Sequence, residues 1–307
     1  MTDLTTQTEA FGFPSVIQGL DFSTYLEIEA LNSHGAQTIL DKSPAHFAYE
    51  REHPREQSAA MRLGTLLHDL LLEPEKCAYR IIPEGADKAS NMGKEVLVSF
   101  YCAALEREAP RIEEKLADGK RLSAQLDILE ASFAERGLYA VKQEAFGRAQ
   151  RMRDSLFANP IAKSILDDGS PEVTLLWRDR EFQVPKKARV DWLPEAHEIM
   201  PDIKTIAAAG WEDTMRSVAK FGYRLQAAHY LEGAAAVGLP HKIFALFFVE
   251  SDPPHGVRLV HFDPRDVQEG AARLRAATRQ YAEAVASGRW PGYPVEIERI
   301  DLPKWAK

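Results

Sequence analysis

The sequence predicts an α/β (α+β) fold in which helices flank a central mixed β-sheet and one long helical segment is inserted. Three β-prone runs follow one another after residue 172 and then give way to a helix. A charged helical stretch separates these runs from the first helices of the chain. With 307 residues, 45% of them hydrophobic, the chain can bury the core of one large domain.

The first half of the chain is predicted to be mostly helical. Residues 1–23 are polar and indicate a flexible N-terminal arm, which leaves residues 24–305 as a single domain. Residues 36–72 have a helical pattern in which leucines form one side while Gly64 and His68 share another. A polar, glycine-containing loop at residues 84–94 then begins a helical insertion that extends to about residue 168.

The second half of the chain is predicted to hold the sheet. Strands are expected over Val173–Phe182, Lys187–Leu193 and His197–Ile203, with a turn at residues 194–196. One long helical pattern follows Gly210. Two more strands and a final amphipathic helix are then expected over Lys242–Glu250, Val257–Phe262 and Arg265–Ser287.

Two aspartates and a lysine on these strands suggest a catalytic group. An acid, any residue and a base should occur by chance about six times in a chain with 46 acids and 38 bases, so Asp202-Ile203-Lys204 alone is weak evidence. Its setting matters more, because aspartate is depleted in strands and Asp191 precedes Asp202 by only 11 residues. Neighbouring strands lie about 5 Å apart, so both carboxylates can reach one ion. Strand alternation sends Asp202 and Lys204 to one face, while the backbone carbonyl of Ile203 is a further ligand.

These residue types fit metal-dependent phosphodiester hydrolysis. Carboxylates bind a hard divalent cation, which offsets the negative charge that develops on an attacked phosphodiester. Lys204 is expected to orient or deprotonate the attacking water and to stabilise the transition state. Glu172 begins the preceding strand and could bind a second ion or the metal-bound water. Mg²⁺ is expected because the ligands are mostly oxygen, and Mn²⁺ would better tolerate a histidine nitrogen.

Polar side chains on the following helix are candidates for holding DNA. Tyr223, Gln226 and Tyr230 are spaced by three and four residues and so form one stripe. Three basic residues, Arg189, Lys220 and Arg224, are candidates for phosphate contacts. Three of these candidates for DNA binding also have an ordinary structural interpretation. Arg189 could pair with a carboxylate, Gln226 could lie on a helix surface, and Tyr230 could pack in the core. Tyr223 is more typical of a structural residue, and an isolated His68 or Glu172 would also be unremarkable.

Several of these segments resemble the PD-(D/E)XK nucleases, and in particular the RecE-like exonucleases (exonuclease VIII type) of phages and prophages. The resemblance extends over roughly residues 24 to 305 and rests on the segments Gly64–His68, Glu172, Lys187–Leu193, Asp202–Thr205 and Tyr223–Tyr230. It implies that His68, Glu172, Asp191 and Asp202 lie at the metal and that Lys204 is the catalytic lysine. Gln226 and Tyr230 resemble the QxxxY motif of RecB-type nucleases.

The resemblance also implies an activity and partners. It implies an Mg²⁺-dependent exonuclease that acts on the ends of double-stranded DNA, degrades one strand 5′ to 3′ and leaves a 3′ single-stranded tail for a single-strand annealing protein. Such enzymes assemble as homo-oligomeric rings, trimeric or tetrameric. The alternatives are a PD-(D/E)XK endonuclease, a single-strand nuclease, or an inactive DNA-binding protein that retains the fold.

Composition sets looser limits. A formal net charge of −8 argues against a surface that coats DNA generally, although it leaves room for a local basic groove. The two cysteines, Cys77 and Cys102, are too few for a disulfide framework or a four-cysteine iron–sulfur cluster. The sequence has neither an 18-residue apolar run nor a basic-then-apolar leader, so we expect a cytoplasmic protein of a bacterium or phage-infected host, with no membrane partner.

Overall fold

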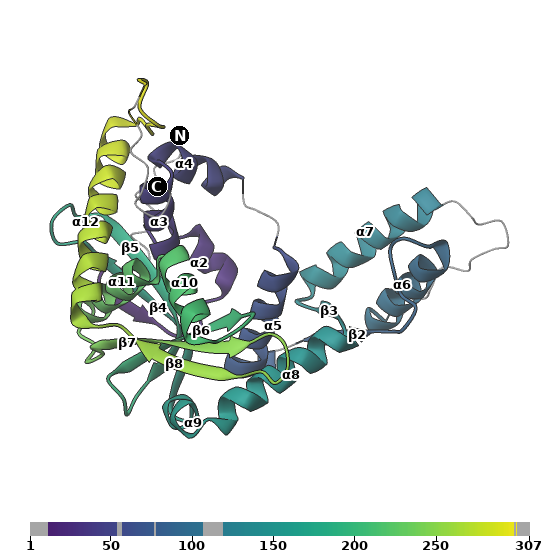
Figure 1. The fold of residues 1–307 in the computed structure, drawn as a ribbon. Coiled ribbons are helices and arrows are strands. Elements are labelled where there is room, and N and C mark those ends of the chain that lie inside the picture. The colour runs from purple at the N-terminus through teal and green to yellow at the C-terminus, as the bar shows by residue number, and fades with distance from the viewer. Residues whose placement is uncertain (1–11, 54–56, 77, 107–118, 298, 300–307) are drawn as a thin grey trace.

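Two three-stranded sheets form the centre of the molecule in the computed structural model, which describes the chain except for residues 1–11, 54–56, 77, 107–118, 298 and 300–307 (Figure 1). The first sheet is antiparallel, with order β1-β4-β5, and contains β1 (Ser15–Ile17), β4 (Gly169–Arg178) and β5 (Pro185–Pro194). The second has order β6-β7-β8 and contains β6 (Ile199–Ile206), β7 (Ile243–Glu250) and β8 (Val257–His261). Because β6 pairs in parallel with β7 and β7 antiparallel with β8, the predicted mixed α+β architecture is confirmed.

The two sheets adjoin along β5 and β6, where the candidate site lies. These strands were expected to be paired neighbours, but no ladder joins them within the described residues. A side chain makes the link instead, because the backbone N–H of Ile203 donates to Asp191 Oδ2 at 2.7 Å.

Helices cover both faces of the second sheet, and the pleat of β6 decides which side chain meets which helix. Ile203 packs with α5 (Ala59–Leu72), α8 (Gln143–Ala158) and α9 (Pro160–Leu166) on one face. Met200 packs with α11 (Tyr223–Ala236) on the other. Asp202 and Lys204 have the same parity as Met200, so they are directed to the α11 face, as the sequence predicts.

A third core joins the N-terminal helices to the last helix. It contains α3 (Ser33–Asp41), α4 (Pro44–Glu52) and α12 (Pro264–Ser287), with α2 (Phe22–Glu27) leading into it. The predicted helical segment 36–72 is therefore three helices, because Ser43 caps a new helix with Pro44 in its first turn. The predicted arm also differs in part, since β1 and α2 begin within residues 1–23, while residues 1–11 lie outside the described residues.

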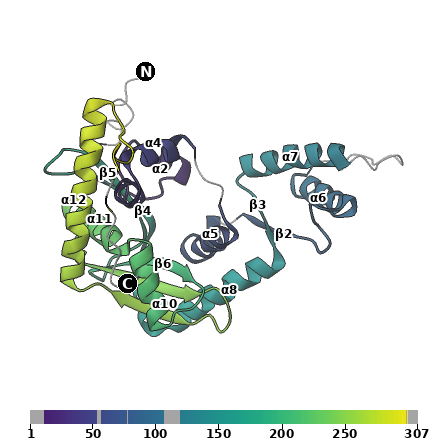
Figure 2. The same cartoon turned by 45° about the horizontal axis from the view of Figure 1, so that its top comes forward.

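The described residues of the predicted insertion project from the sheets only up to about residue 142 (Figures 1 and 2), whereas α8 and α9, also expected in the insertion, pack against the second sheet. The insertion is not wholly helical, because β2 (Tyr79–Ile82) pairs in parallel with β3 (Tyr139–Lys142). The helices α6 (Asn91–Ala104) and α7 (Gly119–Glu135) pack against each other around their own apolar cluster, and a short 3₁₀ turn (Pro74–Lys76) precedes β2. Within the described residues, no helix is long and apolar enough to cross a membrane.

The long helix expected after Gly210 is two helices, α10 (Trp211–Lys220) and α11. Gly222 separates them in the left-handed region with φ 65°, a conformation that suits glycine. A Cβ on Gly222 would also lie 2.2 Å from Gln37 Oε1. The break changes the direction of the chain, so that α11 crosses the sheet.

We expect Gly270→Ala to lower the free energy of unfolding by about 1–3 kcal/mol, the usual cost of overpacking. Gly270 lies where α12 crosses α11, and an added Cβ would be 2.1 Å from the backbone oxygen of Arg224. The matched control is Gly147→Ala in α8, where the Cβ meets only the flexible end of Arg151, at 3.3 Å. Helix propensity alone should make that control about 1 kcal/mol more stable. Equal thermal shifts for the two variants would contradict this account of the α11–α12 contact.

Candidate active site

Three side chains from different elements converge where β4, β5 and α5 meet. Asp191 lies on β5, and Glu172 stands opposite it on β4, between the paired positions 171–192 and 173–190. Glu172 has φ 50°, in the left-handed region that is uncommon for residues other than glycine. His68 comes from α5. One ligand atom of each residue lies within 4.8 Å of the other two.

Hydrogen bonds fix this cluster from both sides. His68 Nε2 lies 2.9 Å from the carbonyl oxygen of Ile203 and 3.8 Å from Asp191 Oδ2. The same aspartate oxygen accepts the N–H of Ile203. The carbonyl of Ile203 therefore points at the cluster, and its role as a metal ligand stays a prediction.

The donor set suits a divalent cation. It combines two carboxylates, one imidazole and one backbone carbonyl, which are ligands of Mg²⁺ and Mn²⁺. Asp191 is 9% exposed, so its negative charge has little water to stabilise it. A bound cation would supply the missing positive charge, and the residues present fit such an ion.

Asp202 and Lys204 form a second, adjoining group on the α11 face. Lys204 Nζ lies 2.5 Å from Asp202 Oδ2, and Gln226 Nε2 donates to Asp202 Oδ1 at 2.7 Å. Asp202 is 1% exposed. Both of its oxygens are thus engaged by side chains of the protein, and the three-residue cluster described above does not include it.

Burial and neighbouring charges shift the pKa values of Asp191 and Lys204. Burial raises the pKa of Asp191 to about 7, and the neighbouring Asp202 adds to the effect, while His68 and Lys204 oppose it. Burial alone would lower the pKa of Lys204, but Asp202 and Asp191 outweigh burial and hold it above its ordinary value. Lys204 is therefore a permanent cation at neutral pH.

The raised pKa of Asp191 should make the stability of the cation-free protein depend on pH. Between about pH 4 and pH 7 the folded state retains a proton that the unfolded state has released, so the free energy of unfolding falls as pH rises through this window. In EDTA we expect the melting temperature of the wild-type protein, measured relative to Asp191→Asn, to decrease from pH 5 to pH 8. A difference that stays constant or increases with pH would contradict the burial of this carboxyl.

Arg189 holds Glu172 in place. Its guanidinium forms an ion pair with Glu172 and donates to the carbonyl oxygen of Leu20 at 2.6 Å. The rings of Phe22 and Tyr25 lie 5.7 and 6.0 Å from the guanidinium carbon. The structural interpretation of Arg189 as the partner of a carboxylate is thus the one that the structure shows, and its predicted contact with DNA phosphate stays a prediction.

The other expected DNA contacts lie in different settings. The Tyr230 hydroxyl donates to the carbonyl oxygen of Arg189, and the residue is only 8% exposed within the core. Arg224 pairs with Asp266 and Glu269 on α12, which places it in the α11–α12 contact. Lys220 is exposed and has its ammonium 5.2 Å from the ring of Phe221. Contacts of these residues with DNA remain predictions.

Tyr223 lies beside the candidate site, and its interpretation as a structural residue stays a prediction. Its ring centroid lies 5.5 Å from Lys204 Nζ, and burial raises its pKa. Its spacing of three residues from Gln226 was the available signal for this position, because that spacing places both side chains over β6. No sequence signal indicated that Leu20, Phe22 and Tyr25 contact Arg189, because these residues are far from Arg189 in the sequence.

Comparisons with known proteins identify the family of the chain and similar solved structures. A family model described as "PDDEXK-like domain of unknown function (DUF3799)" matches residues 33–303. A solved structure of a candidate exonuclease from Eubacterium rectale is similar, with TM-score 0.56 and 13% identity over 94% of this chain and 96% of that one. A phage-related exonuclease from Haemophilus somnus 129PT matches with TM-score 0.26 and 13% identity over 72% of this chain and 95% of that one. No curated protein sequence matches this chain.

Proposed function

This chain belongs to the family of PDDEXK-like domains of unknown function (DUF3799), and on that premise we propose that it is a divalent-metal-dependent nuclease that hydrolyses DNA from duplex ends. The observation that carries the proposal is the convergence of His68, Glu172 and Asp191 beside the Asp202–Lys204 pair. Carboxylates and a lysine in this arrangement suit the hydrolysis of a phosphodiester, whose transition state gains negative charge.

Each residue has a distinct part in the proposed reaction. Asp191, Glu172, His68 and the Ile203 carbonyl would hold the cation, which when bound offsets charge on the phosphate and lowers the pKa of water. Lys204 lies beside two aspartates that raise its pKa, so its positive charge can stabilise the charge that develops on the phosphate oxygens. Gln226 holds Asp202, and Asp202 in turn holds the Lys204 ammonium at the site.

The finer proposal is an exonuclease of the RecE-like type that uses Mg²⁺ and degrades one strand 5′ to 3′. The support is the sequence resemblance, including the Gln226–Tyr230 spacing of the QxxxY motif. On the same basis we propose duplex ends as substrate, a ring-shaped homo-oligomer as the assembly, and a single-strand annealing protein as the partner that takes the 3′ tail.

Digestion of linear duplex labelled separately at each 5′ and 3′ end, with Mg²⁺ and with EDTA, tests this proposal. The expected result is early loss of the 5′ label, a persistent 3′ tail, and no digestion in EDTA. Covalently closed circular duplex is the control and should stay intact. Cleavage of the circle would support the endonuclease alternative, and preferred digestion of isolated strands would support a single-strand nuclease.

Replacing Arg189 with methionine should weaken the affinity for Mn²⁺ by about 10–100-fold, the usual cost of losing a partner that orients a metal ligand. The reason is that Arg189 holds the Glu172 carboxylate in the cluster. Titration calorimetry with Mn²⁺ measures the effect. Arg178→Met is the control, since Arg178 is exposed and bonds the Gln183 carbonyl on the same sheet. Equal Mn²⁺ affinity in the two variants would contradict this role.

A further inference from the structure

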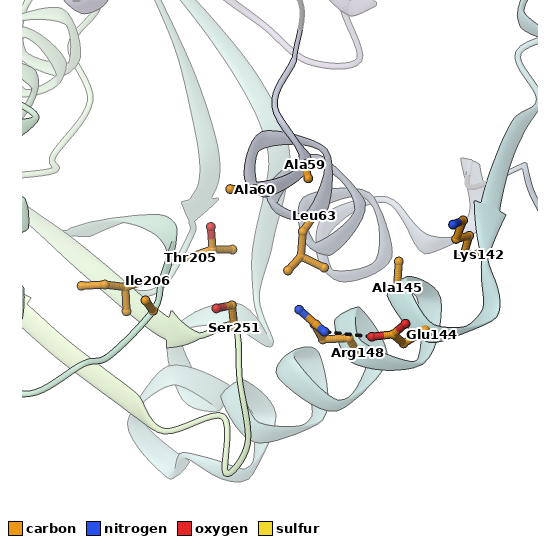
Figure 3. A pocket seen from close by; sticks show the side chains of 11 residues that line it. Ala59, Ala60, Leu63, Lys142, Glu144, Ala145, Arg148, Thr205, Ile206 and Ser251 are labelled. Carbon is orange, nitrogen blue, oxygen red and sulfur yellow. Dashed lines mark hydrogen bonds and ion pairs between the residues drawn. The ribbon is translucent and has the colours of Figure 1, made fainter. Parts of the chain in front are cut away.

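A cleft of about 450 Å³ lies beside the candidate active site (Figure 3). Its walls come from the start of α5, the start of α8 and the end of β6, and Ser251 closes it beyond β7. Leu63 points into the opening from α5, and Arg148 faces it from α8 (Figure 3). The proposed catalytic roles use none of the residues that line it.

The cleft lies next to the metal cluster in the direction along which α5 and β6 run side by side. Along α5, His68 meets the Ile203 carbonyl, and Gly64 lies against Thr205, whose Oγ1 would be 3.6 Å from an added Cβ. Four helical residues advance about 6 Å, which matches the roughly 6.6 Å of two strand residues, so α5 and β6 stay in step. Ala60, one turn further along α5, lines the cleft at about 12 Å along the helix from His68. A chain leaving the metal cluster along β6 would enter the cleft directly.

The lining combines the two kinds of contact that a nucleic-acid strand needs. Arg148 and Lys142 offer cations for phosphates, while Leu63 and Ile206 offer apolar surface for sugar and base. The Arg148 guanidinium lies 3.0 Å from Glu144 and 3.6 Å from Asp252, whose side chains are 79% and 66% exposed. Exposed ion pairs of this kind are weak, so a phosphate can replace them.

The size of the cleft decides between one strand and two. Its volume is near the low end of the range of about 300–1,000 Å³ for pockets that enclose a small molecule. A space of this size can enclose only about one or two nucleotides of a single strand, and a base-paired stack would have to lie outside it.

We propose that this cleft binds a short stretch of single-stranded DNA continuous with the phosphate at the active site, with Arg148 as its main phosphate contact. The inference rests on the proposed nuclease function and specifies the form of DNA that the site handles. It requires the two strands to separate before one of them enters the cleft.

Fluorescence anisotropy with a labelled oligothymidylate in EDTA tests the proposal without any hydrolysis. Arg148→Ala should weaken binding on the order of tenfold, in line with the loss of a charged hydrogen bond. It should also reduce the slope of log affinity against log salt by about 0.7. Glu144→Gln should instead tighten binding, because it frees Arg148. The matched control is Arg153→Ala on the same helix, which removes the same charge but pairs with Asp154 outside the cleft.

Two results would overturn the proposal. One is that Arg148→Ala and Arg153→Ala bind the oligothymidylate with the same affinity. An absence of measurable binding by the wild type would count in the same way. The other is an equal loss of affinity for blunt duplex, which would assign the cleft to double-stranded DNA. Hydrolysis of bis(p-nitrophenyl) phosphate, a diester with no strand attached, separates this test from that of the nuclease function. The wild type should show that activity, and its complete absence would count against the nuclease proposal alone.

Discussion

Replacing Lys204 with methionine should lower the rate of Mg²⁺-dependent DNA digestion by about a hundredfold to a thousandfold, the usual effect of removing one preorganised charge-stabilising group. The physical reason is that the half-buried Lys204 ammonium lies beside two aspartates, which raise its pKa and keep it charged. Methionine fills a similar volume without the charge. The rate is measured on linear duplex at saturating Mg²⁺.

The same variant should also be less stable without a cation. Removing the ammonium leaves the buried Asp202 and Asp191 carboxylates to repel each other, so the melting temperature in EDTA should fall and Mn²⁺ should recover part of the loss. Lys163→Met is the control, since Lys163 is exposed and pairs with Asp167 on the surface. Wild-type digestion by Lys204→Met would remove the lysine from the proposed mechanism.

Replacing Asp191 with asparagine should weaken Mn²⁺ binding by more than about a hundredfold and abolish digestion. Asp191 lies at the centre of the metal cluster. His68 is on one side of it, Glu172 is opposite, and the N–H of Ile203 donates to its Oδ2. Loss of a partner that only orients a ligand already costs about 10–100-fold in metal affinity, and Asp191 is expected to be a ligand itself. Titration calorimetry with Mn²⁺ gives the affinity.

Asp167→Asn is the matched control for this change. Asp167 is about half exposed and pairs with Lys163, so the substitution removes one acid without touching the cluster. Circular dichroism should show both variants folded. Unchanged Mn²⁺ affinity in Asp191→Asn would place the cation elsewhere.

The local pattern of the sequence was sufficient to predict β4 to β8 and the facing of β6. However, β4 begins four residues earlier than expected, with Glu172 inside it, and the short strands β1, β2 and β3 were not predicted. β6 needed only alternation, which directs Ile203 toward α5 and the residues on either side of it toward α11. β7 and α12 were predicted within one residue at each end, because long apolar and amphipathic runs leave little choice. The helical pattern after Gly210, however, could not show the break at Gly222. A glycine is compatible with a continuous helix, and neither the left-handed conformation of Gly222 nor its close approach to Gln37 on α3 has a signature in the sequence.

The composition of the site was easier to predict than its internal connections. The candidate ligands were visible as residue types in strands, but the partners of Arg189 and Gln226 depend on contacts between elements far apart in the chain. Arg189 is held by Leu20 and Phe22, and Gln226 reaches Asp202 only because α11 crosses β6. The left-handed conformation of Glu172 likewise has no signature in sequence.

The central claim is that one divalent cation binds between β4, β5 and α5. X-ray diffraction from crystals soaked in Mn²⁺, with anomalous scattering, measures this directly. We expect a peak within about 2.0–2.3 Å of Asp191 and Glu172 oxygens, with His68 or the Ile203 carbonyl completing the site. A well-occupied Mn²⁺ peak elsewhere, with none beside Asp191, would contradict the account.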